Sequence, residues 1–368
     1  MADWTIDPTI INENEWVAYL AGIACTLDGS PAIAYDKPET LEIIYAYKSG
    51  ESWLQQAVGI YATALIGTPV SLAIDDAGTP HIAYKHAGNK DVMYAKWNGS
   101  SWDIETVDTA GDVGNNIKII LDSDGKPGLV YYDTTNSALK YAKWNGASWG
   151  IESLDSAGLV GTFPSLAFDA TDRPWISYYN YTNSALKYAK WNGASWDIGF
   201  IDEDVATWTP SNSIYIGSDD VPRVAYGSPL KYAVWNGASW DIEAVTEAGA
   251  ADYGKALVVD DNGTPHIIYS DRYNGVRYAV KTGGSWSIET IEDPCMATWP
   301  VAYLDRLTGY AHLAYTRVDS EFPTDPFELR YATGQVCEGG PPGGQPMMKR
   351  ATSVPGSRQW QPKQGLWR

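Results

Sequence analysis

Aromatic side chains and carboxylates gather in five irregular segments of an otherwise regular sequence repeat: TAGDVGNN, SAGLVGTF, EDVATWTP, EAGAADYG and EDPCMATWP. Aromatic rings beside carboxylates are the side chains expected in a sugar-binding site, because the ring offers a flat apolar face and the carboxylate accepts hydroxyl protons. The predicted ligand-binding residues are Trp208, Trp299, Tyr253, Asp112, Asp204 and Asp252. The alternative for the tryptophans is packing, since each precedes a proline by one or two residues at the expected start of a strand.

Further carboxylates lie in or beside the same segments, and they predict a solvated acidic surface rather than a metal site. None of these segments shows the alternating Asp/Asn and Glu spacing of a calcium loop. The group includes Asp108, Asp155, Asp202 and Glu292.

Histidine, the commonest acid–base residue, occurs four times. His81, His266 and His312 occupy the same register in three repeats, directly after a turn, and His86 is isolated in a loop. A repeated register predicts a structural role, so we predict no catalytic residue, no metal ligand and no cofactor.

A sialidase would need an arginine cluster, a nucleophilic tyrosine and turns of the type SxDxGxTW. The turns here read DxxGxP, and Arg277 and Arg330 align with Lys140 and Lys187 as repeat positions. The sequence therefore favours a protein that is not an enzyme. A glycosidase remains an alternative, because so acidic a chain offers many carboxylates for general acid and base work.

The formal net charge of −19, from 45 Asp and Glu against 26 Lys and Arg, disfavours binding to nucleic acid and to anionic membranes. The segment MADWTIDPTI lacks the basic and apolar regions of a signal peptide, and no stretch is long and apolar enough for membrane insertion. We therefore expect synthesis in the cytoplasm. Cys25, Cys295 and Cys337 are widely spaced and predict reduced thiols rather than a disulfide framework.

A tandem repeat dominates the chain. Six equivalent tryptophans are separated by 49, 47, 47, 44 and 46 residues, which is the length of a four-stranded propeller blade. They are Trp53, Trp102, Trp149, Trp196, Trp240 and Trp286. Each follows an Asn-Gly or similar turn between alternating apolar and polar residues, which predicts a β-hairpin.

A second hairpin precedes the first in every repeat, and its second strand ends in a tyrosine. Seven such tyrosines predict seven blades: Tyr35, Tyr84, Tyr131, Tyr178, Tyr226, Tyr269 and Tyr315. The last repeat stops after LRYAT at 329–333, and the N-terminal Asp3-Trp4-Thr5-Ile6 aligns with the missing fourth strand. We predict an all-β, seven-bladed β-propeller of four-stranded antiparallel blades, closed by the N-terminal strand over Trp4 to Ile10.

The repeat, with Trp-Asn-Gly followed by Ser-Trp, resembles that of tandem-repeat seven-bladed propellers, including bacterial and fungal propeller lectins and sialidase-like repeat proteins. The resemblance covers about residues 1 to 335. Because the shared motif forms turns and packing contacts, it implies the fold rather than a particular function.

The loops of a propeller divide between two faces. The turns within hairpins are monotonous and predict a scaffold, whereas the loops between blades vary, so any binding site is predicted on the variable face.

Residues 1–337 are predicted to form the propeller, and residues 338–368 a Gly/Pro-rich linker and tail. The tail from Gly339 has five basic residues and no acidic ones, so residues 1–338 carry −24. The tail residues predicted to anchor a protein partner are Trp360, Trp367, Arg350, Arg358 and Arg368. An ordinary disordered end is the alternative.

Two functional hypotheses follow. In the first, the propeller is a non-enzymatic structural or adhesion module displayed on a large assembly, such as a virion or phage tail, with the tail as anchor and the variable face for interactions, including glycans. In the second, it is a stand-alone carbohydrate-binding lectin.

Overall fold

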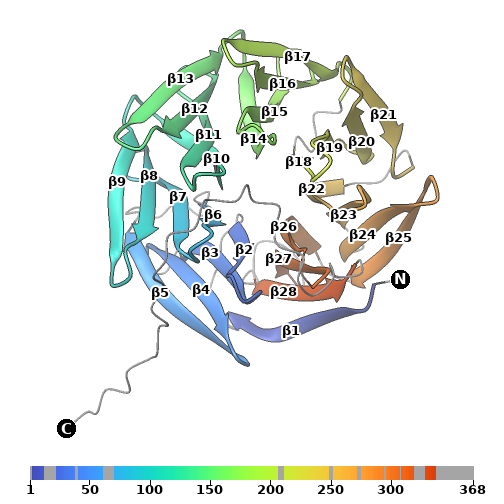
Figure 1. Cartoon of the computed structure of the whole chain (residues 1–368), viewed down its shortest axis with the longest axis horizontal. Helices are drawn as coiled ribbons and strands as arrows, with labels where there is room; N and C mark the ends of the chain where they lie inside the picture. Colours follow the sequence, from blue (N-terminus) through green and yellow to red (C-terminus); the bar gives the residue numbers. More distant parts are fainter. Residues whose placement is uncertain are drawn as a thin grey trace, which may run out of the picture.

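The structure is a computed structural model. It describes residues 2–11, 22–37, 40–60, 70–205, 211–247, 252–271, 275–293, 296–306, 308–318 and 328–336, with the backbone alone for residues 8–11, 252–253, 296–299 and 318. The described elements are all strands, arranged as seven four-stranded antiparallel sheets around a central axis (Figure 1). The predicted seven-bladed propeller is confirmed.

Each blade runs from an inner strand at the axis to an outer strand at the rim. The first blade contains β2 (Gly22–Cys25), β3 (Pro31–Lys37), β4 (Glu42–Ser49) and β5 (Ser52–Ile60). The second contains β6 (Val70–Ile74), β7 (Pro80–His86), β8 (Asp91–Trp97) and β9 (Trp102–Asp108). The third contains β10 (Val113–Leu121), β11 (Pro127–Asp133), β12 (Ala138–Trp144) and β13 (Trp149–Asp155). The fourth contains β14 (Val160–Phe168), β15 (Pro174–Asn180), β16 (Ala185–Trp191) and β17 (Trp196–Asp202).

The remaining blades follow the same order. The fifth contains β18 (Asn212–Ile216), β19 (Pro222–Tyr226), β20 (Lys231–Trp235) and β21 (Trp240–Ala244). The sixth contains β22 (Asp252–Val259), β23 (Pro265–Asp271), β24 (Gly275–Thr282) and β25 (Ser285–Glu292). The seventh contains β26 (Met296–Asp305), β27 (Tyr310–Val318), β28 (Glu328–Gln335) and, from the other end of the chain, β1 (Trp4–Ile11).

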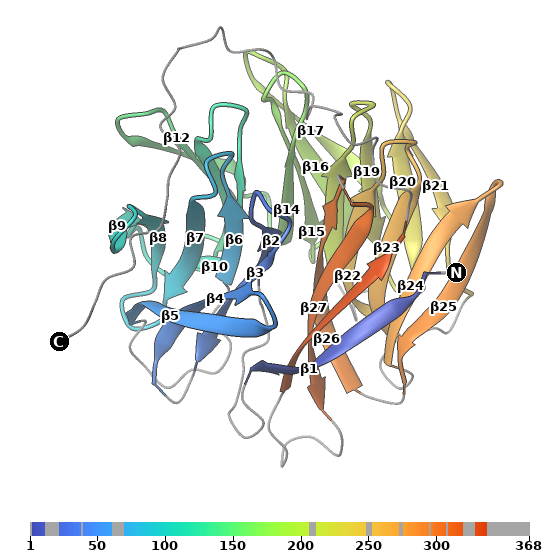
Figure 2. The same ribbon diagram turned by 60° about the horizontal axis from the view of Figure 1, so that its bottom comes forward.

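The seventh blade is completed by β1, as predicted. Trp4 pairs with Gly334, Ile6 with Ala332 and Asp7 with Tyr331 in an antiparallel ladder. Figure 2 shows β1 as the outermost strand of this blade, with β26 and β27 behind it. The two distant ends of the sequence are therefore hydrogen-bonded to each other, and the ring has no unpaired seam.

Side chains shape the turns inside the blades. At the turn between β6 and β7, the Asp75 carboxylate accepts hydrogen bonds from the backbone N–H groups of Ala77 at 3.0 Å and Thr79 at 2.8 Å. Gly78 has a φ of +79°, which a residue with a Cβ adopts only with strain. The Asn98 side chain likewise accepts from the backbone of Ser100 and Ser101. The Asp/Gly and Asn-Gly patterns therefore form hairpin turns, as predicted.

A tryptophan of each outer strand packs edge-on against a tyrosine of the preceding blade, at all seven interfaces. The ring centroids are 5.3 to 5.8 Å apart. The pairs are Trp4–Tyr278, Trp53–Tyr331, Trp102–Tyr45, Trp149–Tyr94, Trp196–Tyr141, Trp240–Tyr188 and Trp286–Tyr232. Such edge-to-face contacts contribute about 0.5–1.5 kcal/mol each beyond the area they bury. The repeated tryptophans are thus accounted for by packing between blades.

Buried polar contacts also join neighbouring blades. Asp108, at the end of β9, accepts hydrogen bonds from the Tyr131 hydroxyl at 2.6 Å and from the Lys140 ammonium, both of the next blade. Burial alone would raise the pKa of Asp108, but these two hydrogen bonds, a third from the Ala110 backbone and the charge of Lys140 together lower it. We call this arrangement of one carboxylate, one tyrosine and one cation the carboxylate clip.

The carboxylate clip recurs around the ring. The equivalent groups are Asp155 with Tyr178 and Lys187, Asp202 with Tyr226 and Lys231, and Glu292 with Tyr315 and Arg317. The prediction that Asp108, Asp155, Asp202 and Glu292 form a solvated acidic surface was therefore wrong. Each carboxylate accepts hydrogen bonds from a tyrosine and a cation of the next blade. In the sequence these four residues lie beside a loop. Nothing in the sequence indicates that this end of the outer strand packs under the neighbouring sheet.

Candidate functional site

A pocket of about 500 Å³ lies between the second and third blades, on the face that carries the hairpin turns. The second blade contributes residues of β7, β8 and β9, and the third contributes the turn between β10 and β11 together with the end of β12. The lining residues are His81, Tyr94, Lys96, Asp103, Ile104, Glu105, Asp124, Gly125, Lys126, Pro127 and Trp144.

The base of the pocket is polar but uncharged. Nδ1 of His81 lies 2.6 Å from the Tyr94 hydroxyl, and Nε2 lies 3.3 Å from the Asp75 carboxylate. Burial lowers the pKa of His81 and raises the pKa of Tyr94, so both side chains are neutral near pH 7. His266 and His312 make the same 2.6 Å contact with Tyr278 and Tyr331. The repetition favours the structural role predicted for these histidines.

The rim of the pocket carries an aromatic ring beside charged groups. Trp144, partly exposed, packs against Trp149 with a centroid distance of 5.5 Å, and Trp149 donates through Nε1 to Glu105 at 2.9 Å. Asp103 accepts a hydrogen bond from the Asn98 side chain at 2.8 Å. Asp103 and Glu105 are nevertheless exposed, so their remaining acceptor capacity faces solvent.

Two lysines add donors to the same rim. The Lys126 ammonium lies 2.8 Å from the Asp124 carboxylate. Lys96 is exposed, and its ammonium makes no hydrogen bond or ion pair with any residue that the structure describes. The pocket therefore offers an apolar ring face, carboxylate acceptors and ammonium donors around one hollow.

The neighbouring interface, between the third and fourth blades, is filled. Gly128 stands at the position of His81, and a Cβ there would lie 2.8 Å from Cζ of Phe168. Lys143, the equivalent of Lys96, donates to the Asp122 carboxylate at 2.7 Å and lies 4.8 Å from the centroid of Phe168. The phenyl ring and the lysine chain thus pack together beside Gly128.

The residues predicted for ligand binding are mostly outside the described side chains. Asp112 is described, and its carboxylate pairs with Lys85 and with Lys90, the latter at 3.3 Å. Asp204 is exposed, and its backbone N–H donates to Asp202 at 3.0 Å. Their role in binding stays a prediction.

Four further predictions also stay untested. The backbone of Asp252 and Tyr253 lies in β22 and that of Trp299 in β26, but their side chains lie outside the described part. Trp208 and the predicted anchor residues of the tail lie outside the described residues altogether. The division into residues 1–337 and 338–368 likewise stays a prediction.

Sequence reasoning missed this pocket because Trp144, Asp103 and Glu105 belong to the regular hairpins, which it assigned to the scaffold. The residue type at position 81 and at the equivalent positions of the other repeats could have indicated the pocket. The residue there varies between repeats as Ala32, His81, Gly128, Trp175, Arg223, His266 and His312, although the flanking residues are regular.

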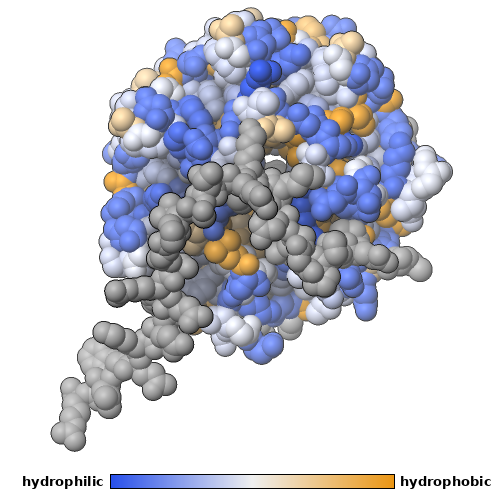
Figure 3. Space-filling model, viewed as in Figure 1, coloured by the Kyte–Doolittle hydropathy of each residue, from blue (hydrophilic) through white to orange (hydrophobic). Residues whose placement is uncertain are grey.

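The rest of the visible surface is mostly hydrophilic, with separate hydrophobic spots (Figure 3). Five isoleucines at one register of the outer strands are 38 to 45% exposed. They are Ile104, Ile151, Ile198, Ile242 and Ile288. Isolated exposed apolar residues of this kind are common on soluble proteins.

Within the described residues, no three His, Cys, Asp or Glu side chains are grouped so as to hold a metal ion. The same part of the chain contains no helix that could cross a lipid bilayer.

The sequence matches no model of a known protein family, and no curated protein is significantly similar to it. Solved structures do share the fold. AofleA from Arthrobotrys oligospora superimposes with a TM-score of 0.55 at 16% identity, covering 80% of this chain and 91% of AofleA. A variant of the Aleuria aurantia lectin AAL, solved with Fucα1-6GlcNAc, gives 0.54 at 16% identity, covering 76% of this chain and 99% of the lectin.

A polysaccharide lyase described as an ulvan lyase gives a TM-score of 0.59 at 13% identity, covering 86% of this chain and 93% of the lyase. At these identities the similarity establishes the β-propeller fold, and the fold is shared by lectins and lyases alike.

Proposed function

We propose that this chain is a non-catalytic carbohydrate-binding propeller, and that its sugar binds in the pocket between the second and third blades. The observation that carries the proposal is the Trp144 ring beside exposed Asp103, Glu105 and Lys96 at the rim of one hollow. The presence of lectins among the proteins of the same fold supports it.

The chemistry of a sugar fits this rim. One face of a pyranose presents C–H groups that pack on an indole, while its hydroxyls donate to carboxylates and accept from ammonium groups. Trp144 would supply the apolar contact, Asp103 and Glu105 the acceptors, and Lys96 a donor. Hydrogen bonds to charged partners are the stronger ones, so these groups would fix the orientation of the sugar.

Catalysis is not favoured by this geometry. His81 has no exposed surface, and its two ring nitrogens already face Tyr94 and Asp75. Asp103 and Glu105 are exposed to solvent, whereas the acid of a glycosidase lies in a desolvated site.

A polysaccharide lyase is the second candidate, because the His81–Tyr94 pair lines the same pocket and lyases share the fold. Such an enzyme would release unsaturated products from an acidic polysaccharide, which ultraviolet absorbance detects. Steady product release that is lost in His81→Gln would establish the lyase and contradict the non-catalytic proposal.

A more specific proposal is that residues 338–368 attach the propeller to a virion, a phage tail or another assembly. None of the described residues supports it. Deleting residues 339–368 tests it, because incorporation into the parent particle would then be lost while sugar binding is kept.

The sugar proposal is tested by a pair of matched variants. Trp144 and Trp191 occupy the same place in their hairpins, packing on Trp149 at 5.5 Å and on Trp196 at 5.6 Å. We expect Trp144→Ala to abolish binding of the glycans that a glycan array identifies for the native chain, and Trp191→Ala to keep it.

Isothermal titration calorimetry with the identified glycan measures both variants, and circular dichroism verifies that both are folded. Equal binding by the two variants would place the sugar elsewhere. An array on which the folded native chain binds nothing would overturn the proposal itself.

A further inference from the structure

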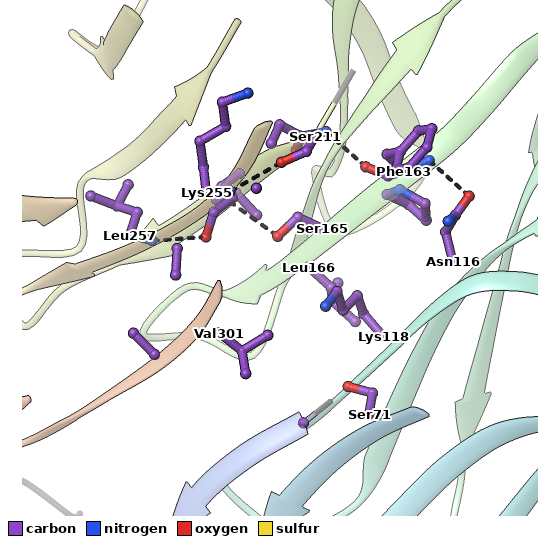
Figure 4. A pocket seen from close by; sticks show the side chains of 18 of the residues that line it. Ser71, Asn116, Lys118, Phe163, Ser165, Leu166, Ser211, Lys255, Leu257 and Val301 are labelled. Carbon is purple, nitrogen blue, oxygen red and sulfur yellow. Dashed lines mark hydrogen bonds between the residues drawn. The ribbon is translucent and has the colours of Figure 1, made fainter. Parts of the chain in front are cut away.

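A second cavity, of about 250 Å³, lies on the axis of the ring, where the inner strands converge (Figure 4). It is lined by residues of all seven inner strands, β2, β6, β10, β14, β18, β22 and β26. It lies at the axis, whereas the sugar pocket lies between two blades nearer the rim.

The charged residues that line this cavity are basic, whereas the protein as a whole is acidic. None of its described lining residues is Asp or Glu, although the chain has 45 acidic residues against 26 basic ones. Its charged members are Lys118 and Lys255. The remaining polar lining consists of serine hydroxyls, asparagine amides and the Tyr215 hydroxyl, all of which can donate a hydrogen bond.

Lys118 breaks the pattern of its register. The ladder between the first and second strand of each blade aligns it with six small or medium-sized residues that have no charge. These are Gly22, Ser71, Ser165, Ser213, Ala256 and Val301. At this register six of the seven blades therefore place no charge at the axis, and the third places an ammonium there.

The Lys118 ammonium has no counter-ion among the described residues. Its side chain projects into the cavity in Figure 4, and no described residue makes a hydrogen bond or ion pair with it. Lys118 is partly buried, and desolvation inside the ring lowers its pKa. A partly desolvated charge without a partner is unfavourable in the folded state, and a bound anion would reduce that penalty.

The serines around Lys118 are oriented by the neighbouring blades. The Ser71, Ser165 and Ser213 hydroxyl oxygens accept the backbone N–H groups of Ile119, Ile214 and Leu257, each at 3.1 Å. Because the oxygen is used as an acceptor, the hydroxyl hydrogen is still available for donation. Hydroxyl donors near an ammonium form the environment that binds an oxyanion.

We propose that the central cavity binds a small oxyanion, with Lys118 as its charged partner and the serine hydroxyls as additional donors. The ligand is small because the cavity lies below the roughly 300–1,000 Å³ of sites for drug-sized molecules. A carboxylate and a tetrahedral phosphate or sulfate share the required chemistry, and titration distinguishes them. The site is independent of the sugar pocket.

The test uses the full chain in anion-poor buffer, titrated separately with acetate, inorganic phosphate and sulfate by calorimetry. We expect at least one of the three to bind and to raise the melting temperature. Lys118→Met should weaken that binding by about tenfold or more, because it removes the charged hydrogen bond. Lys96→Met, which removes an exposed lysine outside the cavity, should bind the anion as the native chain does.

A second readout keeps the test independent of folding defects. Without anion, Lys118→Met should melt at or above the temperature of the native chain, because the variant no longer encloses an unpaired charge. The proposal is overturned if none of the three anions binds the native chain, or if Lys118→Met binds and is stabilised as strongly as Lys96→Met. Trp144→Ala should leave anion binding unchanged, so failure of the sugar proposal and failure of this one are distinguishable.

Discussion

The interface between the second and third blades is open, whereas the interface between the third and fourth blades is closed, although the two are built from nearly the same sequence. Both contain a carboxylate clip and a Tyr–Trp contact at 5.3 Å. They differ at several positions, among them Asp103 against Gly150 and Asp124 against Thr171, and one further pair changes the packing beside the second strand. The open interface has His81 and Leu121, and the closed one has Gly128 and Phe168, where Leu121 and Phe168 each face the proline that begins the second strand.

The contacts that hold the ring together differ from the residues that shape a site. The clip and the Tyr–Trp contact recur without regard to the pocket, so they belong to the scaffold. The pocket depends on whether a large residue at the end of the inner strand fills the space beside the second strand. A glycine at position 128 admits the Phe168 ring, whereas His81 occurs together with the smaller Leu121.

The largest expected effect concerns the carboxylate clip, which both interfaces share. Asp108→Ala and Asp155→Ala should each lower the free energy of unfolding by about 3–5 kcal/mol, because each leaves a buried lysine without its carboxylate. Urea unfolding followed by circular dichroism measures both. Unequal losses would show that the two interfaces differ in their scaffold as well as in their pocket. Asp108→Ala/Lys140→Met, which removes both charges, should recover most of the loss.

The second prediction concerns a double variant in which the open interface receives two residues of the closed one. The double variant His81→Gly/Leu121→Phe should weaken glycan binding by more than about tenfold, since the phenyl ring would fill the hollow. The free energy of unfolding should fall by about 1–3 kcal/mol, because the exchange removes the imidazole that contacts the buried Tyr94 hydroxyl and restores only part of its volume. Calorimetry gives the affinity and urea unfolding the stability. Native affinity in a folded double variant would show that the pocket does not hold the sugar.

The smallest expected effect is on pH dependence. The pKa of His81 is lowered in the folded state by burial, and that of His312 is lowered by burial to about 4, so the unfolded chain takes up these protons first as the pH falls below 6.5. Stability should therefore decline from about pH 7 to about pH 5. The double variant lacks His81 and should decline less steeply, with His312 unchanged. Urea unfolding at several pH values measures both slopes, and identical slopes would contradict a titrating His81.

The sequence predicted the fold well because the fold is periodic. Seven tyrosines at one register, and Asp3-Trp4 aligned with Ser195-Trp196, were enough to predict both the number of blades and the strand that closes the ring. Each of these residues occupies the same register in its repeat, so each repeat supports the assignment of the others.

The candidate sites were harder to predict because they depend on departures from the repeat. Asp108 lies in sequence next to a loop but in space under Tyr131, which only the packing of blades reveals. Trp144 looks like Trp191 in sequence, and part of the difference between their surroundings comes from Phe168, which is remote from both in the chain. Lys118 could have been noticed, since an alignment of the blades places it among Gly, Ser, Ala and Val.

The pairing of β1 with β28 also has a consequence for how the chain folds. Because β1 precedes the other strands of the ring and its partner lies near residue 330, this contact is among the most distant in the sequence, and we expect it to form late. An arc that has not yet closed exposes unpaired strand edges, where pairing with another chain competes with ring closure. We therefore expect residues 2–11 to govern the closure of the ring.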